Sequence, residues 1–260
     1  MKVKRDSADK IASVVIVQPE GEFEFKKAET TAENKPKMTA DEIMTKVIEA
    51  AGGEANWRKI TSRVTVAEID AVHQGVKGTT TSYSKLPNKS ATETTMTAVG
   101  KTIAKGWEFF DGTNGEEQYS FAPLEKLAGK KLEDAKLNSD MLSLLNWKTN
   151  YKTVVVKGTE KVGDEECYVV EFTPEKGTKF TEFYSTKTFY LLKRNGVSPS
   201  STSDNSQPYV VIYSDYREVD GIKLPFKTVN STPSMGDIVS IIKSVKHNVA
   251  IMIRRLLRES

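Results

Sequence analysis

The 260-residue chain is predicted to be mainly β, of the α+β class, built on a large, curved antiparallel sheet. Three observations predict this. Most of the chain after residue 62 consists of short stretches with a hydrophobic period of two. Turn sequences such as Gly163-Asp164 and Val219-Asp-Gly221 separate those stretches. Helical periodicity is confined to the start and the middle of this region. A meander of about nine or ten strands with few helices follows from this pattern.

The composition excludes several classes of protein. The chain is 38% hydrophobic and 28% charged, which is typical of a globular protein with a real core. The formal net charge is only +3 and the lysines are scattered, so nucleic acid is not an expected partner. Cys167 is the single cysteine, which excludes an intrachain disulfide and a cysteine-rich zinc site. No stretch approaches the roughly 18 apolar residues of a membrane span.

The first residues predict a small element of their own. Ile11 to Gln18 is a β-branched run and Gly21 to Lys26 alternates strictly, which indicates a β-hairpin. A hairpin alone is barely stable, so we expect residues 1–27 to be the remnant of a preceding domain. Residues 28–37 are polar and contain proline, as in an interdomain linker.

The main domain is expected to span residues 38–250 and to begin with a helix. Thr39 and Glu42 form a capping box, and Gly52-Gly53 supplies a left-handed stop. A second short helix carries Trp57 and Ile60. The period then changes to two, in strands predicted at Arg63 to Val72, Gly78 to Leu86, Ser90 to Val99 and Thr102 to Phe110.

The second half of this domain begins with a helical interlude between Pro123 and Asn146. A polar loop is expected from Ser198 to Pro208, and residues 251–260 form a basic tail. Between and around these segments we predict strands at Tyr151 to Val156, Glu166 to Thr173, Thr178 to Tyr184, Thr188 to Lys193, Tyr209 to Arg217 and Leu224 to Val229.

Chemistry-bearing motifs are weak throughout. His73 and His247 have no carboxylate or second histidine at ligand spacing, and phosphate-loop, zinc-protease and nucleophile-elbow motifs are absent. Asp111, Asn114 and the two glutamates after Gly115 are better interpreted as a polar turn than as a calcium site. Cys167 is interpreted as a packed thiol. No catalytic residue, metal site or cofactor is therefore predicted, and the chain itself is not expected to be an enzyme.

Aromatic and leucine side chains form the other candidate site. A sheet curved around its apolar face leaves room for a hydrophobic cavity, unless the helices fill that space as ordinary core, and the pattern alone leaves both open. The candidate wall residues are Trp107, Phe109, Phe121, Leu142, Leu145, Trp147, Val170, Phe172, Phe183, Phe189, Leu191, Tyr213 and Phe226.

Four sequence motifs resemble the lipoprotein-carrier (LolA/LolB-like) superfamily over about residues 37–248. They are Ile48-Glu-Ala-Ala-Gly-Gly-Glu54 with Trp57 and Ile60, Lys85-Leu-Pro-Asn-Lys89, Phe110-Asp-Gly112, and Ser214-Asp-Tyr-Arg-Glu-Val-Asp-Gly-Ile-Lys-Leu-Pro-Phe226. The last is the most specific. The resemblance implies a strongly curved sheet, an incomplete barrel that helices close over a hydrophobic cavity.

The resemblance also implies a function. Carriers of this kind hold the acyl chains of lipoproteins without catalysis, so we expect a non-catalytic hydrophobic-ligand or lipoprotein-binding domain in the periplasm or cell envelope. Its expected partners are a lipid or an acylated protein, and we expect a monomer. The residues before the linker resemble the end of the small β domain that trails serine beta-lactamase-like hydrolases. The alternative is therefore an accessory domain of a larger hydrolase, with its concavity packed and no ligand of its own.

Overall fold

The computed structural model describes residues 2–5, 11–18, 21–26, 38–199 and 206–251. Contacts divide the chain into two compact units, residues 1–35 and 36–260. The first is a three-stranded antiparallel sheet in the order β1-β2-β3, formed by Lys2–Arg5, Ile11–Gln18 and Gly21–Lys26. The predicted hairpin is thus present, with a third strand beside it. The linker and all of the basic tail except Ile251 lie outside the described residues.

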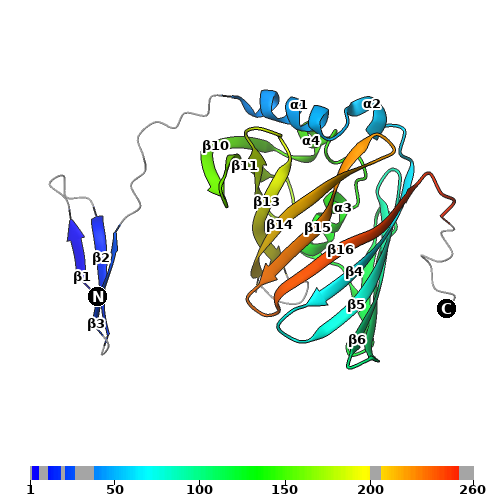
Figure 1. Ribbon diagram of the computed structural model, residues 1–260, viewed down its shortest axis with the longest axis horizontal. Coiled ribbons are helices and arrows are strands. Elements are labelled where there is room, and N and C mark those ends of the chain that lie inside the picture. Colours follow the sequence, from blue (N-terminus) through cyan, green and yellow to red (C-terminus); the bar gives the residue numbers. More distant parts are fainter. Residues whose placement is uncertain (1, 6–10, 19–20, 27–37, 200–205, 252–260) are drawn as a thin grey trace. The chain divides into compact units, whose positions relative to one another are not determined.

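The second unit is one thirteen-stranded antiparallel sheet in the order β10-β11-β12-β13-β14-β15-β16-β4-β5-β6-β7-β8-β9. Figure 1 shows how strongly its strands curve. The strands are β4 Ser62–Ala71, β5 Val76–Lys85, β6 Lys89–Ala98, β7 Lys101–Phe110, β8 Gly115–Tyr119, β9 Glu125–Lys126, β10 Thr153–Val162, β11 Glu165–Thr173, β12 Phe180–Ser185, β13 Leu191–Pro199, β14 Ser206–Val219, β15 Ile222–Thr232 and β16 Gly236–His247. Because β10 and β9 are not paired with each other, the sheet remains open.

The strand prediction is confirmed in outline and wrong in three places. Strands β8, β9 and β16 were not expected. The most important is β16, which joins β15 to β4 and so links the two halves of the sheet. The loop expected at Ser198 to Pro208 is shorter, because β13 continues to Pro199 and β14 begins at Ser206.

Within the residues that the structure describes, four helices accompany the sheet. Helix α1, Ala40–Ala50, begins with the predicted capping box, in which Thr39 and Glu42 bond reciprocally. Helix α2 is Glu54–Trp57. The expected helical interlude is only partly helical, because α3 covers Gly129–Asn138 and the leucine-rich stretch after it forms turns before α4, Trp147–Asn150. None of the helices in the described ranges is long and apolar enough to cross a membrane.

Helix α3 bridges the two ends of the open sheet. Lys131 pairs with Glu117 on β8, near one edge. Asp134 Oδ1 accepts a hydrogen bond from the Thr178 amide, 2.7 Å away, just before β12 near the other edge. At the helix end, Ser139 Oγ lies 2.7 Å from Ser90 Oγ on β6. The helix therefore lies on the inner side of the sheet, between its two ends.

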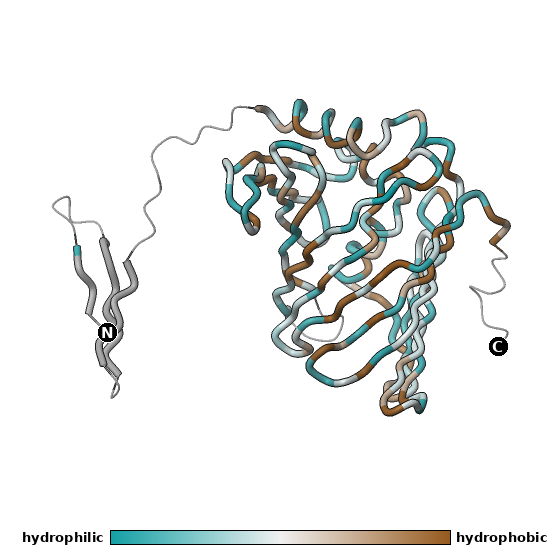
Figure 2. The backbone as a smooth tube through the Cα atoms, in the orientation of Figure 1, coloured by the Kyte–Doolittle hydropathy of each residue, from teal (hydrophilic) through white to brown (hydrophobic). Residues whose placement is uncertain are grey.

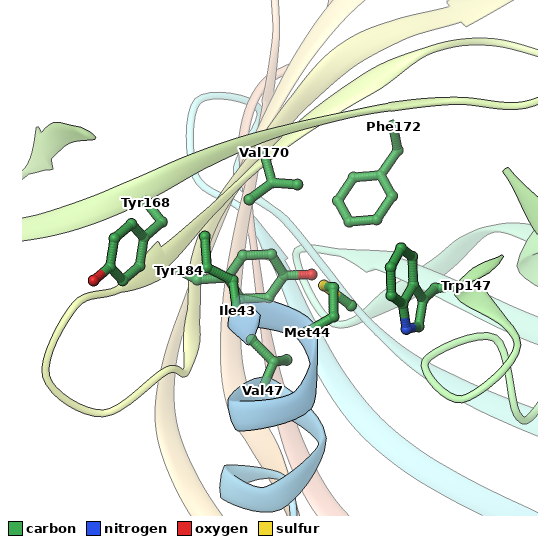
Figure 3. Packing of buried hydrophobic residues seen from close by; sticks show 8 residues of the cluster. All are labelled: Ile43, Met44, Val47, Trp147, Tyr168, Val170, Phe172 and Tyr184. Atoms are coloured by element: carbon green, nitrogen blue, oxygen red, sulfur yellow. The ribbon is translucent and has the colours of Figure 1, made fainter. Parts of the chain in front are cut away.

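The apolar core collects under α1 and α2. One cluster joins Ile43, Met44 and Val47 of α1 to Val170 and Phe172 of β11, with Trp147, Tyr168 and Tyr184 (Figure 3). The second contains Trp57, Ile60, Ile222, Leu224 and Phe226. Hydrophobic and hydrophilic positions alternate along many of the strands in Figure 2, as expected for a sheet with one packed face.

Candidate functional site

A cavity of about 210 Å³ lies between helix α1, the stretch from Ser143 to Tyr151 and the inner face of strands β11 to β15. The α1 helix contributes Met44 and Val47 to its wall. The capping box fixes where α1 begins, and its hydrophobic face points toward β11 (Figure 3). The sheet and α1 together thus line a partly open cavity beside the first core cluster.

Aromatic side chains dominate the wall of this cavity. Phe172 and Phe180 stack with ring centroids 5.2 Å apart, and Tyr151 meets both rings edge-on at 5.0 and 5.5 Å. Such edge and offset contacts hold rings in fixed orientations. The aromatic lining residues are Trp57, Trp147, Tyr151, Phe172, Phe180, Tyr184, Phe189, Tyr190, Tyr213 and Tyr216. The cavity is therefore largely apolar, with tyrosine side chains among its lining residues.

One ion pair is embedded in this apolar wall. Glu182 on β12 and Arg194 on β13 are directly opposite each other in the sheet register. Arg194 donates from Nε to Glu182 Oε1 at 2.8 Å and also from Nη2 to the same oxygen. The Tyr184 hydroxyl donates to Glu182 Oε2. Both carboxylate oxygens are thus engaged, and the Glu182 side chain is only 6% exposed.

Arg194 keeps its charge despite its surroundings. Burial alone would lower the pKa of Arg194, but the adjacent Glu182 carboxylate raises it well above its usual value. Burial, with a further contribution from Glu182, raises the pKa of Tyr151 to about 12 and that of Tyr184 well above the ordinary tyrosine value. These hydroxyls therefore remain protonated hydrogen-bond donors at physiological pH.

The stretch from Asp140 to Asn150 carries one side of the cavity. Asp140 accepts the Leu142 amide at Oδ1, and its Oδ2 accepts the side-chain amides of Asn146 and Asn150 at 2.9 and 2.8 Å. This pattern ties both ends of a leucine-rich turn to one carboxylate. Leu144 and Trp147 project from the stretch into the cavity lining.

The junction between α1 and α2 forms one end of the cavity. The Ala51 carbonyl accepts hydrogen bonds from the Trp57 indole and from the Lys223 amide, at 3.0 and 2.9 Å. All three residues line the cavity. The junction is thereby joined to the β14–β15 turn.

The sequence-based wall residues divide into three groups. Trp147, Phe172, Phe189, Leu191 and Tyr213 line the cavity. Leu142, Leu145, Val170 and Phe226 belong to the core clusters beside it and do not line it. Trp107, Phe109, Phe121 and Phe183 are placed elsewhere.

The last group is separated from the cavity by strand alternation and by distance along the sheet. Phe183 lies between the lining residues Glu182 and Tyr184 in strand β12, so its side chain is on the face of the sheet that points away from the cavity. Phe110 is paired with Ser90, which contacts Ser139 on the inner side of the sheet, so Phe110 is on the inner face. Trp107 and Phe109 are three and one residues out of phase with Phe110, which places them on the outer face. Phe121 is 72% exposed and stacks on Tyr119.

Sequence reasoning missed the polar centre of the cavity. Glu182 and Arg194 lie in strands whose charged residues resemble those of a solvated face. The available signal was the alternation Phe180-x-Glu182-x-Tyr184, which places a charge between two aromatics on one face of a strand.

The remaining candidates form ordinary structure. Asp111 accepts the amides of Thr113 and Asn114, both at 2.7 Å, as the polar-turn interpretation predicts. Cys167 is fully buried, and burial raises the pKa of its thiol to about 11, in agreement with a packed thiol. Within the described ranges, no group of three or more histidine, cysteine, aspartate or glutamate side chains has the arrangement of a metal site.

Comparisons with known proteins identify the fold. No family model and no curated protein matches the sequence. Among solved structures, a DUF1329 family protein from Desulfovibrio piger aligns with a TM-score of 0.53 at 13% identity, over 83% of this chain and 96% of that one. A LolA superfamily protein from Nitrosomonas europaea gives 0.52 at 17% identity, over 82% and 96%.

A third solved structure agrees with these two. A domain named as an outer membrane lipoprotein-sorting protein, from Vibrio parahaemolyticus, gives a TM-score of 0.52 at 11% identity, over 83% of this chain and 95% of that one. At these identities the similarity shows the fold alone. The chain has a LolA-like fold, as its sequence motifs indicated: an open, curved antiparallel sheet with helices on its inner side and at its end.

Proposed function

We propose that this LolA-like domain binds a hydrophobic ligand, a lipid or the acyl chain of a lipoprotein, in the bacterial cell envelope, without catalysing a reaction. The observation that carries the proposal is the aromatic cavity between α1 and strands β11 to β15. The name of the Vibrio parahaemolyticus domain, lipoprotein-sorting, is consistent with such a ligand.

The size of the cavity limits the ligand. An apolar cavity of about 150 Å³ accommodates benzene, whereas drug-sized ligands occupy roughly 300–1,000 Å³. At about 210 Å³ the cavity suits a short hydrocarbon chain or one segment of a longer ligand. Burying each methylene group contributes about 0.8 kcal/mol, so even a segment of several carbons supplies useful affinity.

The polar groups of the cavity support binding rather than catalysis. Glu182 is held by Arg194 and by Tyr184, so its carboxylate is not available as a general base without losing these bonds. Tyr216 is similarly engaged, since its hydroxyl donates to the Leu191 carbonyl at 2.6 Å. Apart from Tyr184, whose hydroxyl bonds the engaged Glu182 carboxylate, no hydroxyl or thiol on the described cavity wall donates a hydrogen bond to a side-chain base.

The test is native mass spectrometry of the purified chain, followed by solvent extraction and by titration with N-phenyl-1-naphthylamine, a neutral dye that fluoresces in apolar sites. We expect a co-purifying lipid or saturable one-to-one dye uptake, with displacement by fatty acid or acylated peptide. A clean apo mass with no dye uptake and no effect of either competitor would overturn the proposal and favour the packed accessory domain.

Two phenylalanines give a matched pair for locating the dye. Phe189 lines the cavity, whereas Phe183 is 3% exposed on the opposite face of β12. Phe189→Ala is expected to change dye affinity at least threefold, and Phe183→Ala to lower stability by about 3–5 kcal/mol without moving dye affinity in the folded protein. Equal effects on dye affinity would show that the dye binds elsewhere.

A further inference from the structure

The Glu182–Arg194 pair gives the cavity a buried polar point with no net charge. Arg194 lines the cavity from the inner face of the sheet, and its side chain is 29% exposed. Its guanidinium also lies over the Phe180 ring, 4.5 Å from the centroid. The exposed part of Arg194 therefore faces the cavity.

The hydrogen-bonding capacity of Arg194 is only partly used. A guanidinium carries five N–H groups, and Glu182 accepts from two of them. In the part of the chain that the structure describes, no other acceptor is recorded for this side chain. Glu182 by contrast has both oxygens occupied, by Arg194 and Tyr184. Because the Glu182 side chain is only 6% exposed and that of Arg194 is 29% exposed, the group that the pair turns toward a ligand is the guanidinium, which is a donor.

The charge of the pair determines whether a neutral or an anionic ligand is favoured. Lys223, the other cation on the cavity wall, is paired with Glu218 at 2.9 Å. A carboxylate placed beside the Glu182–Arg194 pair would therefore add one uncompensated negative charge to an apolar site, which is costly. An ester or amide carbonyl accepts the same hydrogen bonds and adds no charge. Resting on the proposed function, we propose that the cavity selects neutral acyl compounds, esters or amides, over free fatty acid anions, and that Glu182 determines this selectivity.

The test compares two competitors with the same chain, methyl decanoate and decanoate, for displacement of N-phenyl-1-naphthylamine at pH 8. The ratio of their dissociation constants is measured in each variant, since an ester is intrinsically more hydrophobic than an anion. Glu182→Gln leaves Arg194 without a counterion, so decanoate can pair with it. We expect this variant to shift the ratio at least tenfold toward decanoate.

Matched controls separate charge from shape. Glu171→Gln makes the same chemical change on β11, at a side chain that pairs with Lys157 and Lys179 and does not line the cavity. Glu171→Gln should leave the ratio within about twofold of wild type. The double variant Glu182→Gln with Arg194→Gln again has no net charge, and its ratio should return toward the wild-type value.

The outcomes distinguish this inference from the proposed function. If the wild-type protein does not take up the dye, the proposed function fails. If dye and both competitors bind but the ratio is the same in wild type and Glu182→Gln, cavity binding stands and selection by Glu182 is overturned. If Glu182→Gln does not fold, the double variant decides: a ratio shifted tenfold toward decanoate there would contradict the charge-balance argument.

Discussion

Arg63 and His247 form a buried hydrogen bond that requires a neutral histidine. Arg63 Nε on β4 donates to His247 Nε2 on β16 at 3.0 Å, and His247 Nδ1 lies 2.8 Å from Asp220 Oδ2. The His247 side chain is 1% exposed. Because an arginine has no acceptor, His247 Nε2 must be unprotonated, and Nδ1 carries the proton toward Asp220.

This arrangement predicts a loss of stability in mild acid. Burial lowers the pKa of His247, and Arg63 adds to this effect, while Asp220 opposes it. The unfolded chain, with a histidine pKa of about 6.5, therefore takes up a proton before the folded protein does. This part of the stability is complete above about pH 6.5 and is lost as the pH falls toward the lower pKa of the folded state.

Urea unfolding between pH 5 and pH 8 measures this component. His247→Gln, which does not titrate, should show a flatter dependence on pH than wild type over the acidic half of this range. His73→Gln, which replaces the other histidine, is the matched control and should keep the wild-type slope. A variant at position 247 with an unchanged slope would assign the pH dependence to other groups.

Gly52 is required by both its backbone conformation and its surroundings. Its φ is +110°, and a Cβ there would lie 2.2 Å from the Gly221 carbonyl oxygen. Gly53 also has a positive φ, but a Cβ there would meet nothing within 4 Å. Gly53→Ala should cost about 1–3 kcal/mol from backbone strain alone. Gly52→Ala should cost at least about 2 kcal/mol more, measured by chemical denaturation. Equal losses of stability in the two variants would mean that the β14–β15 turn, which contains Gly221, moves away from Gly52 at no cost.

Cys167 is predicted to be unreactive in the folded protein. The thiol is fully buried, and burial raises its pKa to about 11, so almost none is thiolate at pH 8. Modification by a disulfide reagent at pH 8 should therefore be slow in buffer and become stoichiometric within minutes in denaturant. Rapid stoichiometric labelling in buffer would contradict the buried position.

Local patterns in the sequence were sufficient for the first helix and for most strands. The Thr39–Glu42 box and the Gly52-Gly53 stop depend on neighbours in the chain, so their signal is present in the sequence. Strand β16 was missed although its Ile and Val residues favour a strand. What the local sequence does not contain is its place in the sheet, because β16 pairs with β4, far away in sequence.

The candidate cavity was only partly predictable for a related reason. Hydrophobicity identifies Phe172 and Phe183 equally well, yet only Phe172 lines the cavity. Which face of a strand points inward depends on the register of its neighbours. The polar centre was harder still, because Glu182 meets Arg194 only after β12 and β13 have paired.

Asp140 is predicted to hold the leucine-rich side of the cavity in place. Its carboxylate accepts from the Leu142 amide and from the side chains of Asn146 and Asn150. Hydrogen bonds to a charged group contribute more than neutral ones, so Asp140→Ala should lower the free energy of unfolding by about 2–3 kcal/mol. Because Leu144 and Trp147 lie in this stretch, dye affinity should change as well.

Asp164→Ala, in an exposed turn, is the control and should alter stability by less than about 0.5 kcal/mol and leave dye affinity unchanged. If Asp140→Ala matched Asp164→Ala in both measurements, packing of the leucines alone would hold the stretch.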